Sequence, residues 1–413
     1  MKVSIHKKRT PILIAFFLLL LQQVLLNITT GFVNSAISGL DELIAILGIF
    51  TLFACAVQKK LRLDKIDLRM LWFYSGFTLL SFLSNVRTPL QSVFDNLTDF
   101  IVCSRFIVFY LITRCLIKKV NNRELIKEIS KGCKFLTWVT LGLAIHDTLM
   151  TPFFVKSDTR FGISSLQLFY PHPSYMAVAC FSCAIVFGMM LALEKNRAYF
   201  HYFAINCILM LLTLRTKAIA SAICIFFLWY AIVKLNVQFK KLMLGIAGVF
   251  ALVFGKSQIN FYYGKQVVGG TRALMTRDSV RLANRYFPLG SGFGTFGSNI
   301  AAKHYSPLYV ELGYLSIENG KENAYLSDVF WPIVIAQSGW MGLINFIGVL
   351  TCLFQKCFDM EKKNRYFYWL MLSILIYELI SSTSEPAFFN PSTAVLFVLF
   401  GMMINIVEEI KLN

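Results

Sequence analysis

Residues 260–296 read NFYYGKQVVGGTRALMTRDSVRLANRYFPLGSGFGTF and lie within one long polar segment that extends from Lys256 to Ser327. On both sides of this segment the chain is nearly continuous apolar sequence, broken by short connections. Apolar runs of about 17 to 25 residues are long enough to cross a bilayer as helices, which satisfy their own backbone hydrogen bonds inside lipid. The pattern therefore predicts an all-α polytopic membrane protein with one elaborate loop on one side of the membrane.

The composition agrees with a membrane protein, because the 413 residues are 57% hydrophobic and 15% charged. We expect about twelve transmembrane helices from the lengths of the apolar runs. Nine are expected in residues 1–255, the long loop in residues 256–328, and three more in residues 329–413. The seventh and eighth are separated by the short stretch from Leu212 to Ala218, so one bent pair is the alternative. The expected spans centre near Leu19, Leu47, Leu79, Ile107, Leu143, Ala184, Leu209, Ile225, Ala247, Leu343, Ile374 and Phe397.

The net charge of +18 comes from basic clusters on alternate connections, which indicates membrane orientation rather than nucleic-acid binding. Short cytoplasmic loops of membrane proteins are enriched in lysine and arginine. Both termini are therefore predicted to be cytoplasmic, and the long polar loop is predicted to lie outside. The clusters are Lys7, Lys8 and Arg9; Lys59, Lys60, Arg62, Lys65 and Arg69; Lys118, Lys119, Arg123, Lys127 and Lys131; Lys195 and Arg197; Lys234, Lys240 and Lys241; and Lys356, Lys362, Lys363 and Arg365.

Two motifs that can signal cofactor chemistry are interpreted as structural. None of the ten cysteines lies in the long loop, which excludes a loop held by disulfides, and the pair Cys180 and Cys183 lies inside an apolar run. The stretch PLGSGFG lacks the Gly-Lys-Ser ending of a phosphate loop, so we interpret it as a turn that brings the chain back to the membrane. No metal site or cofactor is predicted.

Arginines are concentrated in a predicted helix of the long loop, from Thr271 to Tyr286. Arg277 and Arg281 are four residues apart and share a helix face, and Arg272 lies at the start of the helix. Guanidinium groups bind phosphate through paired hydrogen bonds and keep their charge at any relevant pH. The cluster suits a lipid-linked pyrophosphate, and a solvated helix face is the alternative.

Two shorter outer connections carry further candidates. Arg215 stands between two apolar runs and is followed by Lys217; cations at such boundaries often mark substrate paths, and snorkelling is the alternative. Arg160 opens RFGISSLQLFYPHPSYMA, in which His172 is a candidate base and Tyr175 a candidate binding residue. The alternative there is an ordinary interfacial loop.

Carboxylates near the outer ends of the last spans are candidate proton acceptors. Asp328 and Glu322 precede the tenth expected span, although Asp328 is alternatively the N-cap of that helix. Glu378 lies in the apolar stretch LIYELIS and is a functional candidate by position, or a partner of a neighbouring arginine. Asp99 and Arg105 are interpreted as a structural pair.

Taken in order, these segments resemble the O-antigen ligase and polymerase superfamily of bacterial envelope glycosyltransferases. Members carry Gly-x-Arg, a helix, a Pro-Leu-x-Gly-x-Gly-x-x-x-Phe turn, and a helix with Gly-x-x-Gly. LRTKAIASA around Arg215 resembles the family's Ser-Arg-Gly-Ala stretch, and RFGISSLQLFYPHPSYMA resembles its Arg-x-x-Gly…Pro-Asn segment. The matching positions in the long loop and the next span are Gly270, Arg272, Pro288, Leu289, Gly290, Gly292, Phe296, Gly339 and Gly342.

The resemblance implies a C-type (GT-C) membrane glycosyltransferase fold in a bacterial inner membrane. It also implies that the substrates are undecaprenyl-pyrophosphate-linked glycans at the periplasmic face, with no metal required. Arg215 and Arg272 are then expected to hold the pyrophosphate, and Asp328 or His172 to deprotonate the acceptor hydroxyl. The residues expected to bind and position the glycans are Arg160, Arg277, Arg281, Lys217 and Tyr175.

One departure bears on the reaction within this family. Ligases carry a His-Asn pair ahead of the Gly-x-x-Gly helix, where this chain has Asp328 and Val329, with His304 as a candidate substitute. This departure favours polymerisation of repeat units into O-antigen, capsule or exopolysaccharide, with a chain-length regulator as a further partner. The alternatives are a ligase that transfers glycan to lipid A-core and, in another class, a transporter or flippase, whose polar residues should lie near the bilayer midplane.

Overall fold

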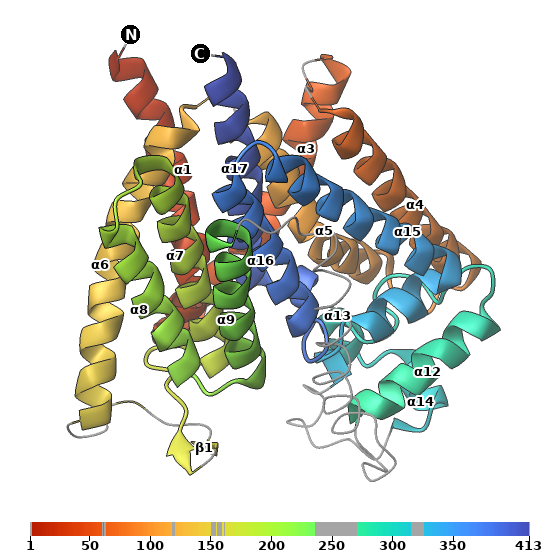
Figure 1. Cartoon of the computed structure of the whole chain (residues 1–413). Helices are drawn as coiled ribbons and strands as arrows, with labels where there is room; N and C mark the ends of the chain where they lie inside the picture. The colour runs from red at the N-terminus through yellow and green to blue at the C-terminus, as the bar shows by residue number, and fades with distance from the viewer. Residues whose placement is uncertain are drawn as a thin grey trace.

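The protein folds almost entirely as helices (Figure 1). The computed structural model describes residues 2–59, 61, 63–117, 120–149, 154, 159–160, 162–235, 271–314 and 326–412. Within these ranges, seven helices are long and apolar enough to cross a membrane. The predicted class of an all-α polytopic membrane protein is therefore confirmed, whereas the number of twelve spans and the GT-C fold stay predictions.

Each expected span centre falls in a helix, except Ala247, which lies outside the described residues. The long helices are α1 (Lys2–Ile28), α3 (Leu40–Val57), α4 (Lys65–Arg87), α5 (Val93–Cys115), α6 (Asn122–Leu149), α7 (Pro173–Glu194), α8 (Ala198–Leu212), α9 (Thr216–Leu228) with the π-helical turn η2 (Trp229–Lys234), α12 (Thr271–Arg285), α15 (Trp331–Glu361), α16 (Arg365–Ser381) and α17 (Ala394–Leu412). The shorter elements are α2 (Gly31–Ser38), α13 (Asn299–Lys303), α14 (Pro307–Glu311), the 3-10 turns η6 (Ala387–Phe389) and η7 (Pro391–Thr393), and the antiparallel strands β1 (Thr159–Arg160) and β2 (Ile163–Ser164).

The two ends of the bundle differ in what they carry. Both termini and the connection between α3 and α4 lie at one end, and α12, α14 and β1 lie at the other (Figure 1). The seventh and eighth expected spans are separate helices, because α8 and α9 are joined by a tight turn in which Leu214 has a φ of 52°. The segments that carry the predicted site residues therefore meet at the end opposite the termini.

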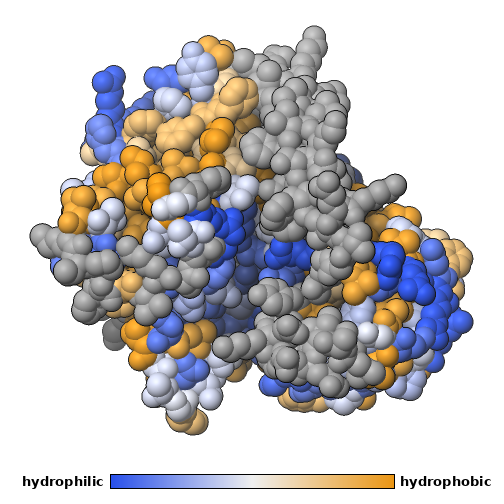
Figure 2. All heavy atoms as spheres, turned by 90° about the horizontal axis from the view of Figure 1, so that it is seen from below, coloured by the Kyte–Doolittle hydropathy of each residue, from blue (hydrophilic) through white to orange (hydrophobic). Residues whose placement is uncertain are grey.

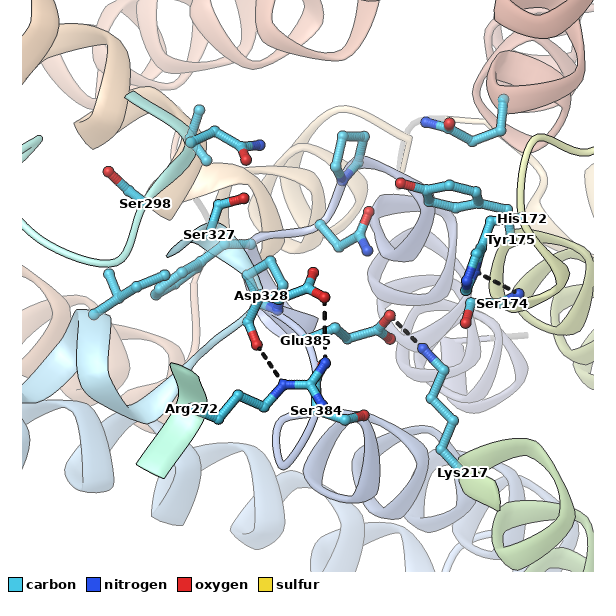
Figure 3. A pocket seen from close by; sticks show the side chains of 18 of the residues that line it. His172, Ser174, Tyr175, Lys217, Arg272, Ser298, Ser327, Asp328, Ser384 and Glu385 are labelled. Carbon is cyan, nitrogen blue, oxygen red and sulfur yellow. Dashed lines mark hydrogen bonds and ion pairs between the residues drawn. The ribbon is translucent and has the colours of Figure 1, made fainter. Parts of the chain in front are cut away.

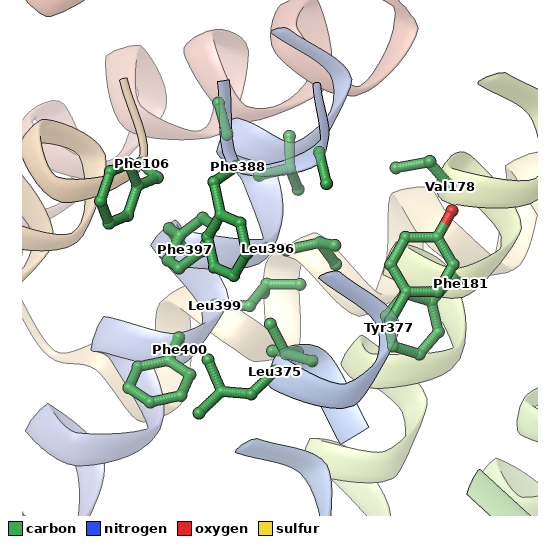
Figure 4. Close-up of a cluster of buried hydrophobic side chains, with 14 of the residues drawn as sticks. Phe106, Val178, Phe181, Leu375, Tyr377, Phe388, Leu396, Phe397, Leu399 and Phe400 are labelled. Carbon is green, nitrogen blue, oxygen red and sulfur yellow. The ribbon is translucent and has the colours of Figure 1, made fainter. Parts of the chain in front are cut away.

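Helices that are distant in the chain pack side by side in the bundle. α4 lies along α15, α5 lies against both α3 and α17, and α16 contacts α7 and α9. Their shared interior is apolar and rich in aromatic rings (Figure 4). We call one part of it the aromatic cluster, which consists of Phe106, Phe330, Phe346, Phe388, Phe389 and Phe397. Its ring centroids are 4.9–6.3 Å apart in the pairs that join it, such as Phe330 with Phe389 and Phe106 with Phe389, a spacing at which aromatic rings attract each other.

A buried ionic cluster ties four helices together at the end of the bundle that carries the termini. The side chain of Arg114 on α5 is 2% exposed, and its guanidinium lies 2.8 Å from Glu408 Oε1 on α17 and 3.5 Å from Asp67 Oδ2 on α4. Lys356 Nζ on α15 lies 2.6 Å from Asp67 Oδ1. Buried charges are tolerated when they are paired, so these contacts hold the helices in register at that end.

The helix α15 is broken at Gly339, which has a φ of 67° and a ψ of −172°. The break frees the carbonyl groups of Ala336 and Gln337 from the helical pattern. They accept hydrogen bonds from the backbone N–H groups of Ser291 and Gly292, at 2.8 and 2.9 Å. The glycine-rich turn therefore completes the backbone hydrogen bonds of the broken helix.

The glycine-rich turn comprises residues 287–297, and its backbone also forms hydrogen bonds with side chains of α4 and α5. The backbone N–H of Phe293 donates to Asn85 Oδ1 at 2.9 Å, and that of Gly294 donates to Asp99 Oδ2 at 2.7 Å. These amides already have acceptors, so they are not directed at a phosphate. The interpretation of PLGSGFG as a structural turn agrees with this arrangement.

Replacing Gly339 with alanine is expected to lower the free energy of unfolding by roughly 2–4 kcal/mol, from left-handed backbone strain and overpacking together. A Cβ at this position would lie 2.2 Å from the carbonyl oxygen of Leu289, which is backbone and cannot turn aside. Thermal unfolding of the detergent-solubilised protein measures the loss. Gly142→Ala is the control, because nothing lies within 4 Å of that position and alanine favours its helix. Equal stability of the two variants would contradict this account of the break.

Candidate functional site

A pocket of about 840 Å³ lies at the end of the bundle opposite the termini (Figure 2). Figure 2 shows this face, on which hydrophilic residues gather in a central hollow with apolar surface around it. The walls include the first residues of α7, α9 and α12, the residues before α15 and the connection after α16. The N-terminus of a helix carries a partial positive charge, so three such starts favour an anionic ligand.

Most of the residues predicted for the site line this pocket, although they come from segments far apart in the chain. Arg277 and Arg281 are not among the lining residues. Both guanidinium groups lie 3.2 Å from Asp278 Oδ1, and their side chains are 64% and 65% exposed on the outer face of α12. The predicted residues that line the pocket are Arg160, His172, Tyr175, Arg215, Lys217, Arg272 and Asp328.

Arg272 on α12 contacts two other segments of the chain, one with Asp328 before α15 and one with Ser384 after α16 (Figure 3). Its Nε donates to the backbone oxygen of Asp328 at 3.2 Å, and its NH2 group donates to the Asp328 carboxylate at 3.2 Å. The same NH2 group donates to the backbone oxygen of Ser384 at 3.0 Å. The guanidinium is therefore held by two backbone oxygens and by one carboxylate, with a quarter of its side chain exposed.

A second ion pair lies beside the first, between Lys217 at the start of α9 and Glu385 after α16 (Figure 3). Their side chains are 9% and 13% exposed, so both charges are largely removed from water. Glu385 was not predicted as a site residue from the sequence. The available signal was weak, since Glu385 is one carboxylate in a short outer connection, and its partner lies far away in the chain.

His172 and Tyr175 line the pocket at the start of α7, across from Arg272 (Figure 3). The His172 ring caps this helix, because its Nδ1 accepts a hydrogen bond from the backbone N–H of Ser174 at 3.2 Å. In the neutral ring the proton then lies on Nε2, which suits donation better than acceptance. Asp328 is therefore the better placed of the two predicted proton acceptors.

Two more arginines reach the pocket from shorter outer connections. Arg160 lies on β1, and its NH1 group donates to Thr216 Oγ1 at 3.5 Å. Arg215 is the residue that precedes α9, next to Thr216 and Lys217. Arg160, Arg215 and Lys217 therefore gather around the start of α9, as an anionic ligand would require.

Burial and the neighbouring charges act on the pKa of the Asp328 carboxyl group in opposite directions. Burial raises the pKa of Asp328 above its usual value, Arg272 opposes this shift, and the nearby negative charge of Glu385 adds to it. Lys217 lowers the pKa again, so the two cations partly offset the burial. A carboxylate with a raised pKa is a better proton acceptor than an ordinary exposed aspartate.

The other acidic candidates have different surroundings. Glu322 lies outside the described residues, and Glu378 is fully buried and is not among the pocket-lining residues. Asp99 lines the pocket wall. Arg105 acts on Asp99 by its charge, but its ion pairs are made with other carboxylates, because six residues along α5 turn the two side chains apart.

Arg105 instead crosses to the start of α3. Its Nε lies 2.6 Å from Asp41 Oδ2, and its NH2 group lies 2.7 Å from Glu42 Oε1. His304 is also engaged elsewhere, with its Nδ1 2.7 Å from Asp95 Oδ1. His304 is therefore not brought to the pocket.

The pocket offers guanidinium, ammonium and helix N-termini to an anion, and carboxylates to a proton or a hydroxyl group. Across the described ranges, no group of three or more His, Cys, Asp and Glu side chains is arranged to hold a metal ion. The site is therefore described by its anion-binding and proton-accepting groups. Comparison of the chain with models of known protein families and with characterised proteins found no match.

Proposed function

We propose that the protein is a bacterial inner-membrane glycosyltransferase that polymerises undecaprenyl-pyrophosphate-linked oligosaccharide repeat units at the periplasmic face. The observation that supports this most directly is the meeting of Arg160, Arg215, Lys217 and Arg272 with the carboxylate of Asp328 in one pocket. A lipid-linked diphosphate needs cations, and an attacking sugar hydroxyl needs a proton acceptor. The pocket supplies both at one end of a membrane-spanning bundle.

The proposed reaction exchanges one bond at the anomeric carbon of the donor sugar. The acceptor hydroxyl oxygen forms a bond to that carbon, and the bond from the carbon to the phosphate oxygen breaks. The electron pair stays on the diphosphate, where Arg215, Arg272 and Lys217 stabilise the charge. Asp328 takes the hydroxyl proton. The products are the lipid diphosphate and the lengthened glycan, so a nucleotide sugar is not needed.

A transporter of the same lipid is less well supported by the position of the aromatic cluster. Phe389 lines the pocket, and its ring centroid lies 6.3 Å from that of Phe106 and 4.9 Å from that of Phe330. Phe389 belongs to the aromatic cluster, of which Figure 4 shows Phe106, Phe388 and Phe397. A transporter should offer polar groups near the midplane, whereas the aromatic cluster that Phe389 joins to this pocket is apolar.

Polymerisation is favoured over ligation by the residue at the pocket wall. In the ligases that the chain resembles, a histidine precedes the Gly-x-x-Gly helix, and the matching residue here is Asp328, which lines the pocket. His172 and His304 offer no equivalent base, because one caps a helix and the other contacts Asp95.

Deletion of the protein in its source bacterium separates these candidate functions. We expect loss of the long-chain glycan ladder on electrophoresis, with a single capped repeat unit retained on the surface. Loss of all attached glycan would instead indicate the ligase. Accumulation of lipid-linked repeat units on the cytoplasmic side, measured by their accessibility in membrane vesicles, would indicate the transporter. An unchanged surface glycan would contradict all three.

A further inference from the structure

The described side chains that line the pocket carry nearly balanced charges before any ligand is bound. Arg272 is paired with Asp328, and Lys217 is paired with Glu385 (Figure 3). A diphosphate that is esterified at both ends carries two negative charges, and two of the cations that it would meet are already paired with carboxylates. The described charged residues that line the pocket are four cations, Arg160, Arg215, Lys217 and Arg272, and three carboxylates, Asp99, Asp328 and Glu385.

The contacts of Arg272 differ in how easily they can be exchanged. Two of them are to the backbone oxygens of Asp328 and Ser384, and these fix the guanidinium in place. A further contact is to the carboxylate of Asp328, on a side chain that is 46% exposed. That carboxylate can turn about its own side-chain bonds while both backbone contacts remain.

We propose that the Asp328 carboxylate holds the place of a ligand phosphate on Arg272, and that binding of the diphosphate donor displaces it. The displaced carboxylate then becomes the proton acceptor for the hydroxyl of the second glycan. This assignment rests on the proposed function, and it adds an order to that function, with the donor bound before the acceptor is activated.

The charges around Asp328 determine the direction of the proton exchange. The charged groups that face it are Arg272 from α12, Lys217 from α9 and Glu385 from the connection after α16. When a ligand phosphate binds the Arg272 guanidinium, Asp328 loses the contact with its main positive partner. It also gains the negative charge of the phosphate as a neighbour. Both changes raise the proton affinity of a carboxylate that is already partly buried. At a pH between the pKa values of Asp328 in the free and bound protein, donor binding without an acceptor should therefore take up a proton from solvent. Above both values the carboxylate stays ionised and can accept the hydroxyl proton.

The proton uptake can be measured with a probe that does not itself titrate. Methyl farnesyl diphosphate is esterified at both ends. The probe therefore lacks the terminal phosphate proton that titrates at about pH 6. Isothermal titration of the purified protein in two buffers of different ionisation enthalpy yields the number of protons exchanged. We expect uptake of up to about one proton per ligand, between the pKa values of Asp328 in the free and bound protein. The uptake should disappear at higher pH, where the carboxylate is ionised in both states.

Three variants assign the proton to its group. Asp328→Asn should bind the probe without proton uptake, and more tightly than the original protein, because no carboxylate has to be displaced. Arg272→Ala should bind more weakly. His172→Gln should retain the uptake, which separates Asp328 from the histidine of the pocket.

The outcomes are distinguishable. Binding without proton uptake, or uptake that survives in Asp328→Asn, would overturn the displacement of the carboxylate while leaving the proposed function in place. A weaker affinity of Asp328→Asn with an unchanged melting temperature would do the same. Absence of any binding of the probe would overturn the proposed function, and the displacement with it.

Discussion

Replacement of Arg272 with alanine is expected to reduce the rate of glycan elongation by about 10²- to 10³-fold, the usual cost of removing one donor that stabilises a developing negative charge. Arg272 is the cation that contacts Asp328, and it is held against two backbone oxygens in the pocket. The rate is measured with purified protein in lipid nanodiscs and a synthetic polyprenyl-diphosphate oligosaccharide. Arg272→Lys keeps the positive charge but lacks the paired N–H donors of a guanidinium group. Its elongation rate should therefore be only slightly higher than that of Arg272→Ala.

The matched control for this change is Arg285→Ala on the same helix. Arg285 pairs with Glu311 on the exposed face of α12, its side chain is 54% exposed, and it is not among the pocket-lining residues. Its removal should leave elongation unchanged. A normal elongation rate in Arg272→Ala, or an equal loss in both variants, would contradict the assignment of Arg272 to the leaving diphosphate.

Replacement of Lys217 with methionine should destabilise the protein by about 3–5 kcal/mol, because it leaves a largely buried carboxylate without its partner. Glu385 is 13% exposed, and the neighbouring Asp328 and Glu378 are also acidic. The unpaired carboxylate escapes this cost by taking up a proton. The deficit in melting temperature should therefore be largest at alkaline pH and should shrink as the pH falls.

The double variant Lys217→Met with Glu385→Gln separates stability from function. It removes both charges together, so it should regain most of the stability lost in Lys217→Met. Elongation should remain low, because the cation that contacts the diphosphate is still missing. Recovery of elongation along with stability would show that Lys217 acts only by neutralising Glu385.

Much of the fold could be predicted because the membrane imposes one simple rule on each segment. Runs of apolar residues must form helices in lipid, and this rule placed helices such as α7 and α17 without any knowledge of their neighbours. The cations of the outer connections could be predicted for a related reason. Arg160, Arg215 and Lys217 stand out because their surroundings are otherwise apolar or uncharged.

The differences between the predicted site residues and those that line the pocket came from helix geometry and from long-range contacts. Nine residues turn an α-helix by about 180°, so Arg281 faces away from Arg272 on α12, and Asp278 holds it there. The opposite directions of Arg272 and Arg281 could have been calculated from the nine-residue spacing between them in the sequence. Glu385 could not have been found in this way, because its pairing with Lys217 depends on how α16 packs against α9.

The glycine-rich turn has a practical consequence for mapping the topology of this protein. Residues 290–298 are buried against α4, α5 and α15, although they belong to the segment expected outside the membrane. A cysteine introduced there would be shielded from water-soluble reagents on either side and would mimic a membrane span. Labels at Arg281 or Lys303, which are exposed on the same segment, would report the side correctly. A labelling map drawn without these positions would add a span that does not exist and invert every segment after it.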